Sequence, residues 1–407
     1  MRRFLVRRIL SSIITLLLFA TLVFFLANAL MPGDFTNNFM PGLGAQRQVL
    51  REQLGLDRPL WAQWLRFMTS FVQGEFGVSN SGRPILEIML ILLPWTMLIF
   101  TFAVTVAFLF GHWLGRMVGW SRNKAVKGVI RFFAVTAHTA FPPILTFLLA
   151  IGFVAGFSDL AWAALQRVED VDAGGFRIGR AAISIPEGQE GILWAMIAGL
   201  MGVGAVALAV GWVFRRLTRR RLPGVVTLAI WVGGNAWFWS ALGELPRAMD
   251  ILGLLLLPLL AVAILAFGEI ALVVESAMDG VRGEEYILAA RAKGLSEVDI
   301  RDHHAARVAL LPALSKFVVS LPFVLTGLVI VEFSFSVPTQ YGATLYFPGL
   351  SIVLFRALEA RDFPLVVGGL LFIGMISIVA RIVIDVLHAV LDPRIRYGLE
   401  TESEMAL

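Results

Sequence analysis

The sequence of 407 residues contains no cysteine, so disulfide bonds, iron–sulfur clusters and thiolate zinc sites are excluded. It is also poor in charge. Only 15% of the residues are Asp, Glu, Lys or Arg, whereas a soluble globular protein usually carries about 25%. Hydrophobic residues make up 58% of the chain, and the mean hydropathy is +0.81. A soluble chain this apolar would expose large hydrophobic patches, so the composition predicts a polytopic membrane protein.

Common motifs of catalysis and nucleotide binding are absent as well. The sequence has no GxxxxGK(S/T) motif to cradle nucleotide phosphates, and it has neither HExxH nor GxSxG. We therefore expect a chain that is not an enzyme and that binds no cofactor or metal. The net charge of +5 does not indicate nucleic acid as a partner, because Lys and Arg collect in the cytoplasmic loops of membrane proteins. The arginine cluster RRLTRRR at 215–221 is interpreted as such a topology signal.

Long apolar runs predict an all-α protein with about eight transmembrane helices and with both termini in the cytoplasm. The first run is too long for the core of a signal peptide, which favours a retained helix. The third run contains Pro142 and Pro143, which predict a kink. This topology puts every arginine-rich loop on the same side of the membrane. The predicted spans are 9–31, 92–114, 132–157, 192–214, 223–243, 251–274, 317–337 and 363–391.

The spans and the polar stretches between them divide the chain into six predicted segments. They are a cytoplasmic N-terminus with the first helix (1–31), an extracytoplasmic amphipathic segment (32–91), the second and third spans (92–157), an extracytoplasmic loop with a helix pair (158–250), a core with a cytoplasmic loop at 276–312 (251–398), and a cytoplasmic tail (399–407).

The longest strongly charged segment, residues 284–312, lies between two apolar runs. Its first part is rich in alanine, which favours a helix, and Lys293 suits the negative end of the helix dipole. Gly294 can take the left-handed conformation that ends a helix. Ser296 and Asp299 then form a capping-box-like start to a second helix. The segment predicts a short surface helix that presses into a groove of another protein, and an ordinary amphipathic surface helix is the alternative.

This segment resembles the cytoplasmic EAA loop of ABC-importer permeases. The resemblance rests on Ala289-Ala290 followed by Gly294, and on Leu311-Pro312. Tyr286, the run ARAKGL that begins at Ala290, and His304 are similar to the dipeptide/oligopeptide branch of that family. The resemblance covers about residues 1–157 and 250–398. Further matching stretches are LREQLGLDRPL (50–60), GEFGVS (74–79), the Glu and Phe of 331–333, ALEARDFP (357–364) and DPRIRYG (392–398).

The resemblance implies the helical bundle of a type I ABC-importer permease in the plasma (inner) membrane. In that family the cytoplasmic helix docks into a cleft of an ATPase subunit. The partners implied are a second homologous permease subunit, two cytoplasmic ATPases that use ATP and Mg²⁺, an extracytoplasmic solute-binding protein and the lipid bilayer. The solute implied is a peptide, with an oligosaccharide, a nickel chelate or another small solute as alternatives. The residues implied for ATPase coupling are Glu285, Tyr286, Ala289, Ala290, Arg291, Lys293 and Gly294.

The sequence departs from the family pattern in three places. The family usually has six spans in this subunit, so the helix pair at 192–243 is interpreted as an insertion of unassigned role. Leu288 occupies the place of the Glu of the general EAA pattern, which the peptide branch commonly lacks too. Glu275 stands where relatives usually carry an arginine.

Ionisable residues inside predicted spans are the remaining candidates for function. Glu332 either lines the solute pathway or makes a structural hydrogen bond. Arg381 and Asp385 are spaced to pair on one helix face, as a structural pair or a gate. His138 is interpreted as a packing residue, while Glu269 and Glu275 approach the end of their span and are expected to reach water. An ion-coupled transporter or an intramembrane enzyme that uses Glu332, His138 and Asp385 is the alternative from another class.

Overall fold

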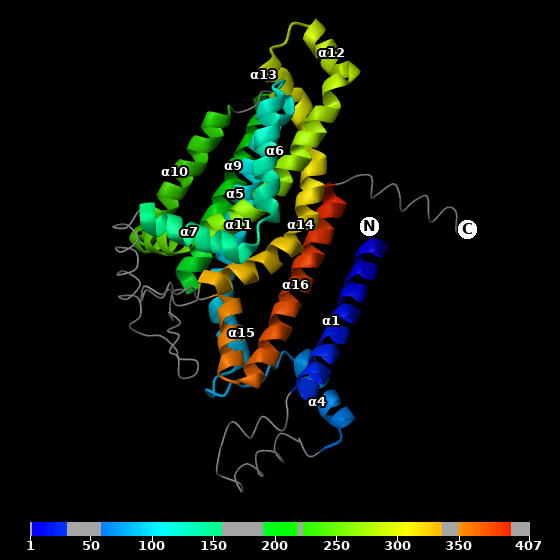
Figure 1. Cartoon of the computed structure of the whole chain (residues 1–407), viewed down its shortest axis with the longest axis vertical. Coiled ribbons are helices and arrows are strands. Elements are labelled where there is room, and N and C mark those ends of the chain that lie inside the picture. The colour runs from blue at the N-terminus through cyan, green and yellow to red at the C-terminus, as the bar shows by residue number, and fades with distance from the viewer. Residues whose placement is uncertain (1, 31–57, 157–189, 219–222, 336–348, 392–407) are drawn as a thin grey trace, which may run out of the picture.

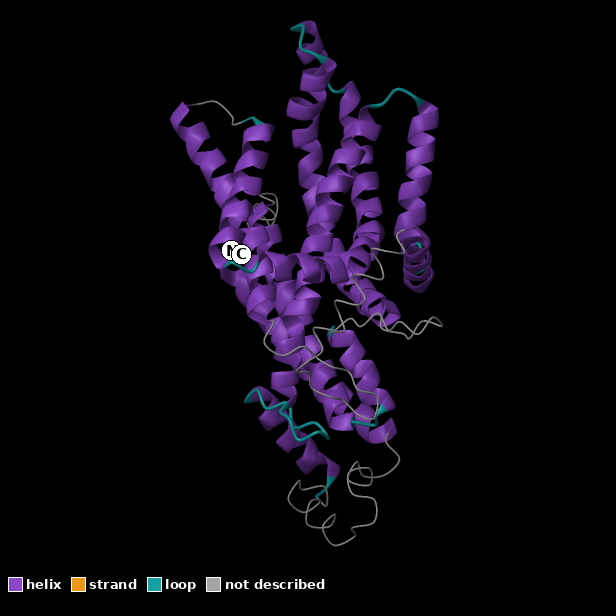
Figure 2. Cartoon of the chain, turned by 90° about the vertical axis from the view of Figure 1, so that its left-hand side faces the viewer, coloured by secondary structure: helices purple, strands orange, loops and turns teal. Residues whose placement is uncertain are grey.

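The computed structural model describes residues 2–30, 58–156, 190–218, 223–335 and 349–391. The regular elements in these ranges are helices, and one isolated antiparallel bridge joins Val78 to Pro84. Figure 1 shows a long bundle with the short helix α12 at one extremity and helices α4 and α15 near the other. Figure 2 shows the same elongated shape from the side. The two extremities are called the α12 end and the α15 end below.

The bundle consists of long and short helices in chain order. The first half contains α1 (Arg2–Leu30), α4 (Leu60–Val72), α5 (Ile85–Trp120), α6 (Lys124–Thr139), α7 (Pro142–Gly156), α9 (Glu190–Thr218) and α10 (Gly224–Leu242). The second half contains α11 (Leu245–Gly280), the 3₁₀ turn η1 (Val281–Gly283), α12 (Glu285–Ala292), α13 (Glu297–Asp299), the π-helical turn η2 (Ile300–Ala305), α14 (Ala306–Phe335), α15 (Leu350–Glu359) and α16 (Phe363–Leu391).

Six of the described helices are long and apolar enough to cross a membrane, and up to eight spans result if each of two bent pairs counts as one. The prediction of about eight spans agrees with the upper number. Helix α5 is longer than its predicted span and begins at Ile85, inside the segment predicted to be extracytoplasmic. The whole stretch 32–57 of that segment lies outside the described residues.

The predicted third span is not one kinked helix. It is split into α6 and α7, which are bent by 110° relative to each other. The break falls at Ala140 and Phe141, just before Pro142, because a residue that precedes proline is driven out of the helical region. A second bend of 46° falls between Leu310 and Pro312, and α14 continues through it.

Helices α5 and α11, of 36 residues each, form the central seam of the bundle. Gly111, Gly115 and Gly119 recur every fourth residue on α5 and face α11. A methyl group added at Gly115 would lie 2.6 Å from the carbonyl oxygen of Ala271. Because these glycines have no side chains, the two backbones come into direct contact. The sequence analysis did not identify this seam.

The buried core has three main parts along the bundle. Trp95, Leu193 and Leu255 belong to the middle part, which joins α5, α9 and α11. The α12 end has its own cluster, which includes Ile287 and Ala290 of α12. The cluster at the α15 end joins α5 to α15 and α16, with Met89, Val353 and Phe372 among its members.

The helix pair interpreted as an insertion is attached to the bundle mainly through α9. Leu193 and Met196 of α9 are buried in the middle part of the core. Helix α10 packs on α9, where Gly234 approaches Val203, and none of its apolar window is buried within the chain. Its large side chains, such as Val225 and Trp237, are exposed on the bundle.

Candidate coupling site and buried polar contacts

Helix α12 is short, polar and located at the extremity of the molecule (Figure 1). The acidic Glu285 lies in its first turn and the basic Arg291 in its last turn, which suits the helix dipole. Ile287 and Ala290 point into the core cluster of the α12 end, so they hold the helix against the bundle. The opposite face is left open for contact with another molecule.

Most of the residues predicted to contact an ATPase lie on this open face. Glu285, Tyr286, Ala289, Lys293 and Gly294 are exposed. Burial, and next the charge of Glu284, raises the pKa of Tyr286, so its hydroxyl stays protonated at neutral pH.

Two of the predicted contact residues are engaged within the chain instead. Ala290 is only 5% exposed and faces the core. Arg291 is partly covered, and its Nε donates to Glu297 Oε1 over 2.8 Å. Ala290 therefore orients α12, while Arg291 ties α12 to α13.

The break between α12 and α13 has the geometry that the sequence predicted. Gly294 has φ +77°, which is the left-handed conformation, and the amide of Leu295 donates to the carbonyl of Ala290. Ser296 is the N-cap of α13 and accepts a hydrogen bond from the amide of Asp299 at 3.1 Å. The chain thus turns sharply after α12, which leaves the helix projecting from the bundle.

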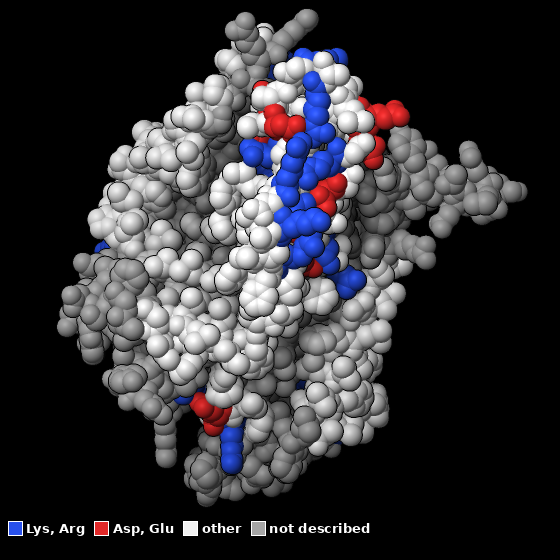
Figure 3. All heavy atoms as spheres, turned by 45° about the horizontal axis from the view of Figure 1, so that its top comes forward, with Lys and Arg blue, Asp and Glu red and all other residues white. Residues whose placement is uncertain are grey.

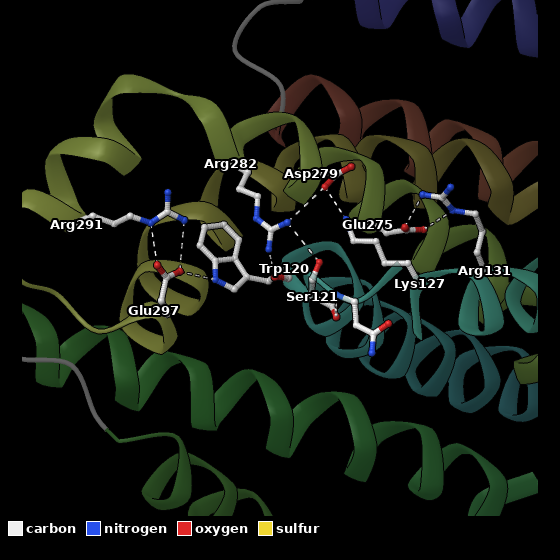
Figure 4. A network of polar contacts seen from close by, with 10 residues as sticks. Trp120, Ser121, Lys127, Arg131, Glu275, Asp279, Arg282, Arg291 and Glu297 are labelled. Atoms are coloured by element: carbon white, nitrogen blue, oxygen red, sulfur yellow. Dashed lines mark hydrogen bonds and ion pairs between the residues drawn. The ribbon is translucent and has the colours of Figure 1, made fainter. Parts of the chain in front are cut away.

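Trp120 at the end of α5 lies beneath this turn, and the sequence analysis did not identify it. Its Nε1 donates to Glu297 Oε2 over 3.0 Å, and the guanidinium carbons of Arg282 and Arg291 lie 5.3 Å and 5.8 Å from its ring centroid. Figure 4 shows the indole between the two arginines. A tryptophan close to the basic residues near 122–131 was the only signal in the sequence.

Two ion pairs connect α6 to α11 next to this group. Nη2 of Arg131 lies 2.6 Å from Glu275 Oε1, and Nζ of Lys127 lies 2.6 Å from Asp279 Oδ1 (Figure 4). The residue Glu275 is only 3% exposed, so the expectation that it reaches water is wrong. Its negative charge is neutralised by the arginine of the neighbouring helix. Figure 3 shows Lys and Arg gathered with acidic residues at the α12 end.

Glu332 lies in α14 and is fully buried. Its Oε1 accepts from Thr96 Oγ1 at 2.6 Å, and its Oε2 accepts from Ser351 Oγ at 2.5 Å and from Ser351 N at 3.2 Å. Gly349 packs so closely that an added methyl group would lie 2.4 Å from the carboxylate. The carboxylate therefore caps the N-terminal end of α15 and joins it to α5 and α14. Of the two alternatives for Glu332, this geometry favours the structural hydrogen bond.

The other intramembrane candidates do not converge on a common site. His138 lies in the last turn of α6, and its Nδ1 lies 3.4 Å from the carbonyl oxygen of Leu265 on α11, which agrees with a packing role. Nζ of Lys316 lies 2.7 Å from Glu269 Oε1, so Glu269 is paired with α14. Arg381 is exposed on α16, but the side chain of Asp385 lies outside the described part of the chain. The proposed pairing of these two residues stays a prediction.

A second buried carboxylate, Asp362, was also missed. It lies before α16, accepts from the amide of Leu365 at 3.2 Å as an N-cap, and accepts from Ser79 Oγ at 2.5 Å and Asn80 N at 3.0 Å. It therefore ties the loop before α5 to the turn between α15 and α16. An aspartate just before Phe363-Pro364 is a typical helix start, and this signal could have found it. Among the described residues, no group of three or more His, Asp or Glu side chains is placed to hold a metal ion.

Long apolar helices with a short helix projecting beyond them are typical of a polytopic membrane protein. The chain belongs to the family of binding-protein-dependent transport system inner membrane components, whose model matches residues 107–397, and the N-terminal model of such components matches residues 1–104. It is thus a multi-pass inner-membrane permease subunit. The predicted resemblance to the dipeptide/oligopeptide branch of ABC-importer permeases and the predicted helical permease fold are confirmed.

Relatives over nearly the whole length agree with this family. The chain is 28% identical over 401 residues to the glutathione transport system permease protein GsiC of Salmonella paratyphi A, covering 98% of this chain and 100% of the relative. It is 28% identical over 383 residues to the di/tripeptide transport system permease protein DppB of Pseudomonas aeruginosa, covering 93% and 94%. The GsiC protein of Escherichia coli K12 is 26% identical over 402 residues, covering 98% and 100%.

Proposed function

We propose that this chain forms half of the translocation pathway of an ATP-driven importer of peptides. The other half is a second, homologous permease subunit. Peptides are proposed as the solute because the relatives GsiC and DppB are named for glutathione and for di- and tripeptides. A small solute of another kind, such as an oligosaccharide, is the second candidate within the same family.

The observation that carries the coupling role is the exposed face of α12. Ile287 and Ala290 fasten the helix to the bundle, while Tyr286, Ala289 and Lys293 face outward from it. In the proposed assembly this face lies in the cleft of an ATPase subunit. Closure of two cytoplasmic ATPases around ATP and Mg²⁺ moves α12, and the spans respond as rigid bodies that alternate access.

The remaining parts of the proposal follow from this arrangement. The α12 end and both chain termini are cytoplasmic, and an extracytoplasmic solute-binding protein delivers peptide at the α15 end. In this proposal the partner ATPases hydrolyse the ATP, since this sequence has no Walker motif. An ion-coupled mechanism through Glu332 is disfavoured, because its carboxylate accepts from Thr96 and Ser351 and caps α15.

Cysteine cross-linking tests the coupling role cleanly because the chain has no cysteine of its own. We expect a single cysteine introduced as Ala289→Cys to cross-link to an ATPase subunit in native membranes. The matched control is Leu358→Cys on α15, which is also exposed but lies at the opposite end. Cross-links from both positions, or from neither, would rule out α12 as the ATPase contact.

A further inference from the structure

Trp120 is the meeting point of three successive pieces of the loop that carries α12. Arg282 precedes α12, Arg291 lies within it, and Glu297 follows it in α13. Arg282 donates to the carbonyl oxygens of Trp120 and Ser121, and both arginines lie against the indole ring. We call these four residues, Trp120, Arg282, Arg291 and Glu297, the Trp120 clasp.

The positive charge of Arg282 in the clasp suits the C-terminal end of α5. The last carbonyl groups of a helix lack partners within the helix and carry partial negative charge. Arg282 supplies both a donor and a positive charge at that point. A guanidinium close to a tryptophan ring is further stabilised by the ring quadrupole. Trp120 is only 9% exposed, so these contacts are largely shielded from water.

The clasp is attached to an element that reaches the far side of the bundle. From Trp120, α5 runs back to Thr96 without an intervening proline, and at 1.5 Å per residue these 24 steps span roughly 36 Å. Thr96 donates to Glu332 and accepts from the amide of Leu350 at 3.1 Å, at the start of α15. One helix therefore connects the loop of α12 to the group that holds α15.

We infer that Trp120 is a positioning residue that locks α12 to α5, so that movement imposed on α12 is delivered along α5 to α15. This inference rests on the proposed function, because it assumes that an ATPase moves α12. It adds which of the long helices receives the movement and through which side chain. The glycine seam with α11 supports it, since Gly111, Gly115 and Gly119 pack α5 directly against the backbone of α11 in the part of α5 next to Trp120.

The test compares clasp variants in the full assembly. Trp120→Ala removes the ring and its donor, Trp120→Phe keeps an aromatic ring without the donor, and Glu297→Gln removes the charge that faces Arg291. The matched control is Trp113→Ala, which changes an exposed tryptophan of the same helix. Each variant is measured for ATP-dependent uptake, for ATP hydrolysis and for the amount of ATPase that copurifies.

We expect Trp120→Ala to lower the uptake per ATP hydrolysed by about tenfold or more, since it removes two cation–π contacts and a charge-assisted hydrogen bond. Trp120→Phe and Glu297→Gln should fall between Trp120→Ala and the unaltered chain, and Trp113→Ala should match the unaltered chain. A purely structural role would instead lower uptake, hydrolysis and the amount of protein together. That result, or an unchanged ratio in Trp120→Ala, would overturn the inference.

Spin labels give a second readout. Leu288→Cys on α12 and Leu109→Cys on α5 place labels at two exposed positions. If the clasp locks the helices, the distance between the labels stays the same when ATP is trapped, and Trp120→Ala makes it change. A distance that already changes without the Trp120→Ala substitution would contradict the lock. Absence of ATP-dependent uptake by the unaltered assembly would instead refute the proposed function, and the inference with it.

Discussion

Single residues define the two ends of the bundle through backbone geometry and buried charge. At the α12 end, Gly294 adopts a positive φ and ends α12. At the α15 end, Glu332 and Asp362 each use one carboxylate to cap a helix and to bind a residue distant in sequence. A buried carboxylate is costly unless its oxygens are bonded, and both of these are. These positions are therefore expected to be sensitive to small changes.

We predict that Gly294→Ala impairs coupling through backbone strain alone. No atom lies within 4 Å of a methyl group at this position, so there is no clash. The left-handed conformation costs a residue with a side chain roughly 1–2 kcal/mol. Peptide uptake per cell should fall at normal expression. Gly294→Asn is the control, because Asn tolerates this conformation better and should keep more uptake. Wild-type uptake by Gly294→Ala would show that the turn after α12 does not need this conformation.

We predict that Glu332→Ala lowers the free energy of unfolding by about 1–3 kcal/mol for each donor left unpaired in the interior. Gly349→Ala should have a comparable effect, because its methyl group would be forced against the same carboxylate. Thermal unfolding of the purified chain in detergent measures both. The control is Glu244→Ala, which breaks an exposed pair with Arg247 and should cost little. Equal stability of Glu332→Ala and the control would mean that the buried carboxylate does not fasten α15.

Helices are positioned mainly by close packing and by paired charges between neighbours. The α5–α11 seam uses glycines every fourth residue, whereas α6 is held against α11 by two ion pairs and by close contact at Gly268, where an added methyl group would meet the carbonyl of Ala134. Helix α10, by contrast, packs on α9 and exposes most of its apolar surface. The bundle therefore has a tightly packed centre and a loosely attached flank.

We predict opposite effects from the same substitution at two helical glycines. Gly115→Ala should destabilise the fold by about 1–3 kcal/mol, the usual cost of overpacking a filled interface. Gly202→Ala on α9 has open space around it and should be neutral or stabilising, because alanine favours a helix over glycine by about 1 kcal/mol. Unfolding midpoints of the two variants in one detergent give the comparison. A stabilising effect at Gly115 would show that the helices do not touch there.

In the proposed assembly, the whole molecule forms one half of the translocation pathway. Its α12 end is charged and carries the projecting helix, and its α15 end is held together by Glu332 and Asp362 (Figures 1 and 3). Within the described residues, the group at Thr96 and the group at Trp120 lie on the same long helix. Movement applied at one end can thus reach the other end through a single element.

We predict ATP-dependent uptake of a labelled di- or tripeptide into cells that hold the complete assembly. Unlabelled peptides and glutathione should compete with the labelled peptide, because the relatives named for these solutes match this chain over nearly its whole length. An oligosaccharide should not compete. Competition by the oligosaccharide but not by peptides would refute the proposed solute while leaving the permease assignment intact.

The class of protein, the long helices, the break at Gly294 and the family could all be predicted from the sequence, because these depend on local properties. The lengths of the apolar runs, a glycine at a helix end and the EAA-like motif are all visible in the order of the residues. The roles of Glu275, Glu332 and Trp120 could not be predicted from the sequence, because the partner of each lies on another helix more than a hundred residues away along the chain. The structure also showed that the third predicted span consists of two helices bent by 110° relative to each other. It placed the close contact between α5 and α11 at Gly111, Gly115 and Gly119. Spacing along one helix shows which residues share a face, but not which neighbouring helix that face will meet.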